Sequence, residues 1–134
     1  MTIQYLDLVD FVEIACEVTG LDTASVIAMA NPDLADSALH APAAGFGDTD
    51  VYPDFVDKCA VLMVRLARNH PLPDGNKRVS WVALRVFIEM NDWQWIEYPS
   101  VDVAETFVLS VAAGQTNEET AALWLRSRIE PSIE

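Results

Sequence analysis

The residues of this sequence whose types and spacing could do chemistry lie together in one stretch, residues 69–78 (NHPLPDGNKR). His70 carries an imidazole whose ordinary pKa is about 6.5, so it can accept a proton near neutral pH. Asp74 offers the hard carboxylate oxygen that holds Mg²⁺ together with the phosphates of a substrate. Lys77 and Arg78 can neutralise phosphate charge. Phosphoryl or nucleotidyl transfer needs such parts, because its catalysis rests mainly on positioning and charge stabilisation.

The prolines and the glycine of this stretch predict a turn between two helices. Pro71 and Pro73 cannot donate backbone hydrogen bonds and disfavour helical conformation in the residues before them, so the first helix should end near residue 69. The next helix should begin at residues 74–76, where its first backbone N–H groups lack intrahelical partners and lie at the positive end of the helix dipole. Such an end is a ready phosphate site, and Gly75 lets a ligand approach the backbone closely.

The first turn of this second helix places cations where the dipole disfavours them. Lys77 and Arg78 each cost about a few tenths of a kcal/mol there, unless an anion binds nearby. Each part also has a structural explanation: a histidine often ends a helix, an aspartate often caps the next one, and Gly-Asn is common turn chemistry. From the residues alone, an active site and a surface turn therefore both remain open. The spacing of a Walker loop is absent.

Helical periodicity covers most of the chain. We expect helices over residues 5–18, 54–69, 76–90 and 100–111, shorter ones after Asp22 or Thr23 and after Asn31-Pro32, and a last one opened by the capping-box pattern Thr116-x-x-Glu119. The helix at 76–90 is apolar nearly all round and should be the buried central helix. Residues 41–53 form the longest loop and are a candidate flap that selects a target, and residues 91–99 should be a short extended connection. The sequence predicts one all-α domain over residues 1–134.

The charge and composition exclude several classes of function. The net charge is −13, which argues against a nucleic-acid binder. Residues 1–57 contain no Lys or Arg, and six of the eight cations lie between residues 58 and 85. This local basic region suggests an anionic ligand, although it could also balance nearby carboxylates. We expect no membrane segment and no secretory signal, a cytoplasmic location, no zinc site, and buried, unreactive Cys16 and Cys59.

The stretch HPLPDGNKR resembles the H-x-F-x-[DE]-[AG]-N-[GK]-R signature of the Fic/Doc family. The segments KCAVLMVRLARNHP, GNKRVSWVALRVFIEMN and VLSVAAGQTNEETAALWLR resemble the layout of death-on-curing (Doc-type) toxins, so the likeness covers nearly the whole chain. It implies a compact all-α bundle around a buried central helix, with the motif loop at the N-terminus of the next helix. Leu72 stands where the family usually has Phe, and we expect it to be a packing variant that points into the core.

The resemblance implies a role for each matching residue. His70 would be the general base that deprotonates a hydroxyl of a target protein, Asp74 would coordinate Mg²⁺, and Arg78 would complete the catalytic set. ATP would be the nucleotide, and its binding residues would be Arg68, Gly75, Asn76, Lys77 and Arg78, with Gly75 and Asn76 forming the anion-binding nest.

The reaction implied by the resemblance depends on two positions. Fic enzymes that transfer AMP usually have Gly after the Asn and a second Arg three residues beyond the first, whereas this chain has Lys77 and Trp81 there. Both features resemble Doc, in which the γ-phosphate of ATP passes to elongation factor Tu and translation stops; Gly75 is the one Fic-like detail. We therefore expect a Ser/Thr kinase toxin of a type II toxin–antitoxin module. AMP transfer on the same scaffold and a catalytically idle binding module are the alternatives.

Regulation is expected to come from a partner. Many Fic proteins inhibit themselves through an [ST]-x-x-x-E-[GN] helix, and no Glu of this chain has Ser or Thr four residues before it. The resemblance implies a Phd-like antitoxin whose disordered C-terminal segment folds as a helix in a groove of the toxin. We expect no DNA binding by this chain alone and no membrane partner.

Overall fold

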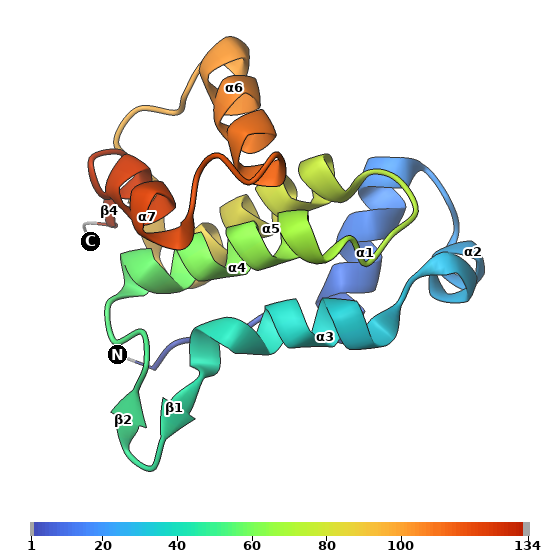
Figure 1. Ribbon diagram of the computed structural model, residues 1–134, viewed down its shortest axis with the longest axis horizontal. Helices are drawn as coiled ribbons and strands as arrows, with labels where there is room; N and C mark the ends of the chain where they lie inside the picture. Colours follow the sequence, from blue (N-terminus) through green and yellow to red (C-terminus); the bar gives the residue numbers. More distant parts are fainter. Residues whose placement is uncertain (1, 133–134) are drawn as a thin grey trace.

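Two long helices joined by a short loop form the centre of the fold, which a computed structural model describes for residues 2–132 (Figure 1). Helix α4 (Phe55–Asn69) leads through residues 70–75 into helix α5 (Asn76–Met90). Apolar residues recur at helical spacing in α4, and 11 of its 15 residues are buried. The aromatic rings of Phe55 and Phe87 stack 5.1 Å apart between the two helices. The motif loop is therefore the connection between the two best-packed helices.

Five further helices pack around this pair. They are α1 (Leu8–Thr19), α2 (Thr23–Met29), α3 (Pro32–His40), α6 (Val101–Ala112) and α7 (Glu118–Arg126). Figure 1 shows α6 and α7 on one side of α4 and α3 on the other. A short 3₁₀ turn, η1 (Ala41–Ala43), follows α3. The all-α architecture agrees with the helical periodicity of the sequence.

The sequence led us to expect that the helix at 76–90 is the central one. In the structure the central helix is α4. Helix α4 packs against α3, α5, α6 and α7, whereas α5 leaves one side open to solvent. Exposed charged residues mark that side: Lys77, Arg78, Arg85 and Glu89. The apolar count of α5 was misleading because Trp81, Val82 and Val86 on its flank are only half-buried. Leu72 is 3 % exposed, so the prediction that it points into the core is confirmed.

Side chains cap nearly every helix. The N-termini of α1, α2, α3, α4, α6 and α7 each have a capping side chain that accepts a backbone N–H: Asp7, Asp22, Asn31, Asp54, Ser100 and Asn117. The predicted Thr116–Glu119 capping box is wrong by one residue, because Asn117 caps α7 and the Thr116 hydroxyl bonds to Ser110 at 2.7 Å. Among the seven α-helices of residues 2–132, only α5 lacks a side-chain cap.

Two small antiparallel sheets complete the fold. Strands β3 (Trp93–Trp95) and β4 (Ile129–Pro131) pair and tie the C-terminal segment to the end of α5. Strands β1 (Gly45–Phe46) and β2 (Thr49–Asp50) form a hairpin within the loop at 41–53. This hairpin precedes α4, whereas the motif loop follows its 15 residues, which span about 22 Å at about 1.5 Å each. The expected flap therefore lies at the opposite end of α4 from His70.

The prediction that both cysteines are buried is confirmed for Cys59 and wrong for Cys16. Cys59 is buried, and burial raises the pKa of its thiol, so it packs as an unreactive side chain. Cys16 is only half-buried, and its Sγ lies 3.9 Å from Thr23 Oγ1.

Within the part of the chain that the structure describes, no helix combines the length and the hydropathy needed to cross a membrane.

Candidate active site

His70 ends α4 in a backbone conformation that is unusual for its residue type. It is the C-cap of the helix, with φ 53° and ψ 57°, in the left-handed region. A residue with a side chain pays about 1–2 kcal/mol for this conformation, so the packing around the loop must impose it. The turn leaves the imidazole exposed, and the ring lines a cavity. A histidine held in this way is presented to a ligand and not to the core.

Asn76 fixes the loop from the first residue of α5. Its side chain is 7 % exposed, accepts the backbone N–H of Leu72 through Oδ1 at 3.0 Å, and donates through Nδ2 to the Leu72 carbonyl at 2.7 Å. The same Nδ2 lies 3.5 Å from Nδ1 of His70. The side chain of Asn76 is thus used within the protein. The group of Asn76 that remains available to an anion is its backbone N–H.

The N-terminus of α5 is open. Gly75 precedes it with φ 90°, and no side chain caps it. Within residues 2–132, no group accepts the backbone N–H of Asn76, Lys77 or Arg78; the first intrahelical bond runs from Val79 to Gly75 at 2.9 Å. A Cβ on Gly75 would lie 3.6 Å from Thr19 Cγ2, which is ordinary contact, so backbone conformation and not space requires the glycine. These N–H groups and the helix dipole favour an anion here.

A cavity of about 530 Å³ joins these groups. The motif loop and the first turn of α5 line one side, including His70 and Asp74. The end of α6 lines the other through Leu109, Ala112 and Ala113. Sequence reasoning missed this wall, because nothing local says which helix faces the loop. The small side chains in VLSVAAGQ (residues 108–115) were the available signal, since small residues leave room beside a helix terminus.

The cations of this region differ from the others in their partners. Three cations elsewhere form ion pairs with carboxylates: Lys58, Arg65 and Arg126. Two more lie over aromatic rings: Arg85 over Tyr98 and Arg128 over Trp124. Within residues 2–132, the remaining cations have neither kind of partner: Arg68, Lys77 and Arg78. These are the cations that the sequence assigned to phosphate binding, so their charge is available to a ligand.

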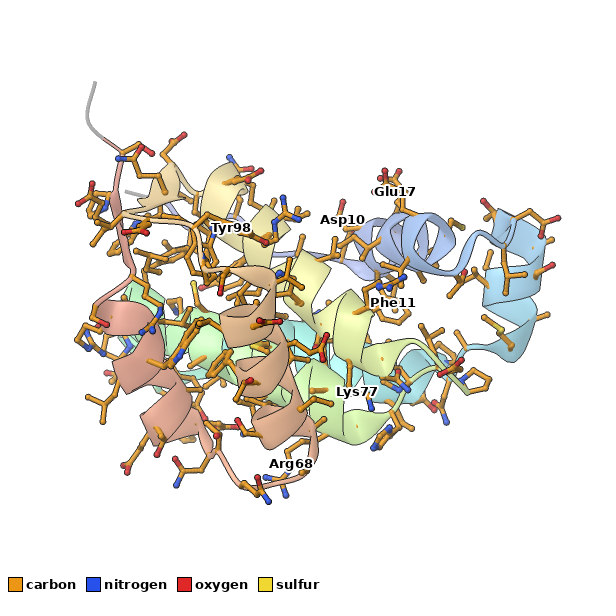
Figure 2. The ribbon with its side chains drawn as sticks, turned by 90° about the horizontal axis from the view of Figure 1, so that it is seen from above. Asp10, Phe11, Glu17, Arg68, Lys77 and Tyr98 are labelled. Atoms are coloured by element: carbon orange, nitrogen blue, oxygen red, sulfur yellow. The ribbon has the colours of Figure 1, made fainter. Side chains whose placement is uncertain are left out.

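Arg68 reaches the site from the last turn of α4. A Cβ on Gly114 would lie 3.5 Å from its Nη2, so the guanidinium packs beside the turn between α6 and α7. Figure 2 shows Arg68 and Lys77 in the lower part of the view, on different elements. Arg68 does not line the 530 Å³ cavity itself, whereas Lys77 and Arg78 do. It stands at the edge of the site.

Asp74 is the one carboxylate among the lining residues of this cavity. Among the described residues, no group of three or more His, Cys, Asp or Glu side chains could hold a metal by itself. Mg²⁺ commonly binds through one or two carboxylates together with waters and substrate phosphates. An exposed Asp74 beside an open anion site fits this mode of binding, in which the substrate supplies further ligands of the metal.

Comparison with known proteins agrees with the sequence signature. Residues 6–88 match the sequence model of the Fic/DOC family. A curated protein of Mycolicibacterium smegmatis (strain ATCC 700084 / mc(2)155), named Toxin Doc, is 39% identical over 89 residues, which are 66% of this chain and 68% of that protein. The family match includes the motif loop and α5 as far as residue 88.

Proposed function

Because this chain belongs to the Fic/DOC family, we propose that it is the toxin of a type II toxin–antitoxin module and a nucleotide-dependent Ser/Thr kinase. The observation that carries the proposal is the open N-terminus of α5, where unbonded N–H groups and the partnerless cations Lys77 and Arg78 adjoin His70 and Asp74. A relative that is 39% identical is named Toxin Doc, which supports the toxin class.

In the proposed reaction, His70 takes the proton from a Ser or Thr hydroxyl of the target protein. The hydroxyl oxygen forms a bond to the γ-phosphorus of ATP while the bond to the β–γ bridging oxygen breaks, and ADP leaves. The N–H groups at the start of α5, with Lys77 and Arg78, stabilise the charge on the phosphoryl oxygens. Mg²⁺ bound by Asp74 would add charge neutralisation. The proton remains on His70 until it returns to solvent.

His70 can be tested against the other histidine of the chain. We expect His70→Ala to abolish both phosphorylation of the target and growth arrest, because Asp74, the one carboxylate lining the cavity, would be occupied as the Mg²⁺ ligand and could not take the proton. His40 lies at the end of α3, bonded to Asp36, so His40→Ala should retain both activities. His70→Asn adopts the left-handed conformation readily and separates loss of the base from loss of loop geometry. Toxicity that survives in a folded His70→Ala protein would favour the idle binding module.

Transfer of AMP uses the same base and the same metal ligand, so the two reactions are separated by the label. We propose elongation factor Tu as the target and arrest of translation as the result. Incubation with elongation factor Tu and Mg-ATP labelled at the γ-phosphate should label the target, and ATP labelled at the α-phosphate should not. Label transferred from the α-phosphate would show that the protein transfers AMP and would contradict the kinase proposal.

The partner that restrains this activity is a Phd-like antitoxin, whose disordered segment would fold as a helix on the toxin. A cavity of about 460 Å³ between α1, α2 and α3 suits an apolar helix face, because Val9 and Ile27 at its rim are 66% and 61% exposed. Residues 1–57 carry acids and no Lys or Arg, so the segment should have cationic flanks. Replacing both Val9 and Ile27 by Glu should leave target phosphorylation intact and remove neutralisation by the antitoxin. Unchanged neutralisation would place the antitoxin elsewhere.

A further inference from the structure

The end of α4 at His70 lacks the backbone hydrogen bonds that usually stabilise a left-handed helix end. Helix α1 also ends in a left-handed residue, Gly20, whose N–H bonds to the Cys16 carbonyl at 2.9 Å. Within residues 2–132, no backbone carbonyl accepts the N–H of His70, and the next residue, Pro71, has no N–H to donate. The conformation of His70 therefore has to be stabilised by contacts from outside the helix.

Two contacts with the first turn of α3 lie on either side of His70. Asn69, the last residue of α4, donates through its side-chain Nδ2 to the Leu34 carbonyl at 3.1 Å. The backbone N–H of Asn31 donates to the Pro71 carbonyl at 2.8 Å. The residue before His70 and the residue after it are thus bonded to the same turn of another helix.

This turn of α3 is itself well fixed. The Asn31 side chain caps it and accepts the backbone N–H groups of Asp33 and Leu34, each at 3.1 Å. Pro32 occupies the first helical position, where its fixed φ suits a helix, and Ala35 is fully buried. The motif loop is therefore bonded to a rigid part of the fold.

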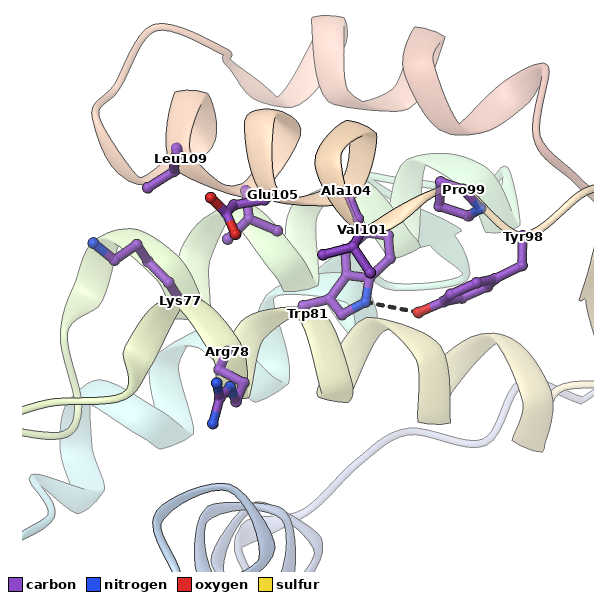
Figure 3. A pocket seen from close by; sticks show the side chains of 10 residues that line it. Lys77, Arg78, Trp81, Tyr98, Pro99, Val101, Ala104, Glu105 and Leu109 are labelled. Carbon is purple, nitrogen blue, oxygen red and sulfur yellow. Dashed lines mark hydrogen bonds between the residues drawn. The ribbon is translucent and has the colours of Figure 1, made fainter.

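The two halves of the motif loop are held by different elements. The side chain of Asn76 holds the later half through Leu72, next to α5. Figure 3 shows Lys77 and Arg78 on the first turn of α5, so these candidate phosphate-binding groups belong to that helix. The contacts with α3 hold the earlier half, at His70. Loss of the contacts with α3 should therefore displace the base and leave the phosphate-binding groups in place.

Resting on the proposed function, we propose that Asn69 is a positioning residue for the general base. Its amide anchors the residue before His70 to α3, and the bond from Asn31 to Pro71 anchors the residue after it. His70 thereby keeps its left-handed conformation, and its ring stays at the cavity that Asp74 also lines. Because displacement of a reacting group by about 1 Å can cost about a hundredfold in rate, this anchor acts on the chemical step.

The first test separates catalysis from nucleotide binding. Asn69→Ala should lower kcat for phosphorylation of elongation factor Tu about tenfold to a hundredfold, and calorimetry should give a Kd for Mg-ATP within about twofold of the wild type. Gln94→Ala is the matched control, because the Gln94 amide also donates over 3.1 Å, to Glu130, from strand β3. The control should change neither quantity. An unchanged kcat in Asn69→Ala, or a loss of Mg-ATP binding as large as the loss of kcat, would overturn the inference.

The second test needs no activity. A positive φ brings the amide proton of a residue close to its own Hα, so the intraresidue NOE between these protons is strong. In the full chain, NMR should show this strong NOE at His70 and also at Asp92, whose φ is 60°. Asn69→Ala should weaken the NOE of His70 and leave that of Asp92 unchanged, which also shows that the variant is folded.

The contact with Pro71 is tested by two variants at one position. Asn31→Ala removes the cap of α3 and keeps the backbone N–H, whereas Asn31→Pro removes both. Ala30, with φ −76° and ψ 148°, has a conformation that suits a residue before proline. Asn31→Pro should therefore weaken the NOE of His70 and lower kcat beyond the effect of Asn31→Ala. Equal effects of the two variants would show that the N–H has no part in the anchor.

The outcomes separate this inference from the proposed function. An Asn69→Ala protein with the NOE of His70 unchanged overturns the inference, while an active wild type leaves the kinase proposal standing. A wild type that transfers no phosphate from ATP contradicts the proposed function. The NOE then still decides about the anchor: a weaker signal at His70 in Asn69→Ala supports it, and an unchanged signal refutes it.

Discussion

At the scale of single residues, Asn76 matters most for the geometry of the site, because it begins α5 and holds the preceding loop at the same time. We predict that Asn76→Ala lowers the free energy of unfolding by about 2–4 kcal/mol, since it leaves the buried N–H and C=O of Leu72 without partners. It should also abolish detectable Mg-ATP binding, because the part of the loop that carries Asp74 loses its anchor. Urea denaturation and calorimetry measure the two effects.

The matched control is Asn91, which makes the same kind of clamp at the other end of α5. Its side chain is 3 % exposed and bonds to Gln4 N, Gln4 O and the Phe87 carbonyl. Asn91→Ala should therefore cost a similar amount of stability and leave Mg-ATP affinity within about twofold, since this site is remote from the motif loop. If both variants bound Mg-ATP equally well, the clamp would have no role in the site.

The residue scale also marks the limit of what the sequence predicts about the site. The types His70, Asp74, Lys77 and Arg78 carry their chemistry in the sequence, and the structure brings all of them to one cavity. Asn76 was predicted as part of the anion nest, but its side chain faces inward. Whether an amide faces a ligand or a backbone depends on burial, which is a property of the folded loop and not of the residue type.

At the scale of elements, the first turn of α5 combines a structural cost with a function. Lys77 and Arg78 lie at the positive end of the helix dipole without carboxylate partners. We predict that Lys77→Ala and Arg78→Ala each raise the free energy of unfolding by about 0.3–1 kcal/mol and weaken Mg-ATP and tripolyphosphate alike. Arg85→Ala, about two turns further along α5, is the comparison that should spare tripolyphosphate. A loss of stability in the Lys77 and Arg78 variants would contradict the dipole argument.

The hairpin β1–β2 depends on one buried cation. Lys58 is 1 % exposed, and its Nζ donates to the Pro42 carbonyl at 2.9 Å and to Asp50 at 3.3 Å. Burial disfavours its charge, but contacts with Tyr5 and Asp50 outweigh burial and raise its pKa, so its contribution to stability is lost only as the pH rises above 10.5.

We predict that Lys58→Met costs about 1–3 kcal/mol and speeds hydrogen exchange in residues 45–50. Mg-ATP affinity should not change, because the hairpin lies at the far end of α4. Exchange measured by mass spectrometry checks the first part, and calorimetry checks the second. A fall in Mg-ATP affinity would show that the hairpin influences the active site and would contradict this prediction.

Helices were predictable and their partners were not. The predicted helices at 54–69, 76–90 and 100–111 agree with α4, α5 and α6 within one residue at each end, because periodicity and caps are local signals. The position of the hairpin relative to His70 and the wall that α6 gives the cavity are contacts between distant segments. No local pattern contains them, which is why the sequence assigned residues 41–53 to target selection without placing them relative to His70, and why it missed the wall from α6.

At the scale of the whole molecule, a net charge of −13 and a small cationic site respond to salt in opposite directions. Raising the ionic strength from about 0.01 M to about 0.1 M shortens the Debye length from about 30 Å to about 10 Å. Screening weakens the repulsion among the carboxylates of residues 1–57, so the melting temperature of the free protein should rise. The same screening weakens the attraction of Lys77 and Arg78 for ATP. The increase in melting temperature caused by a fixed concentration of Mg-ATP should therefore shrink as salt is added.

Thermal melts with and without Mg-ATP across this range test both signs in one experiment. Lys77→Ala is the informative variant: its free protein should still gain stability with salt, whereas its response to Mg-ATP should be small at every ionic strength. A free protein that loses stability with salt would mean that ion pairs such as Arg65–Glu118 and Arg126–Asp57 outweigh the general repulsion. A Mg-ATP response that is independent of salt in the wild type would mean that hydrogen bonds from the start of α5, and not the cations, dominate phosphate binding.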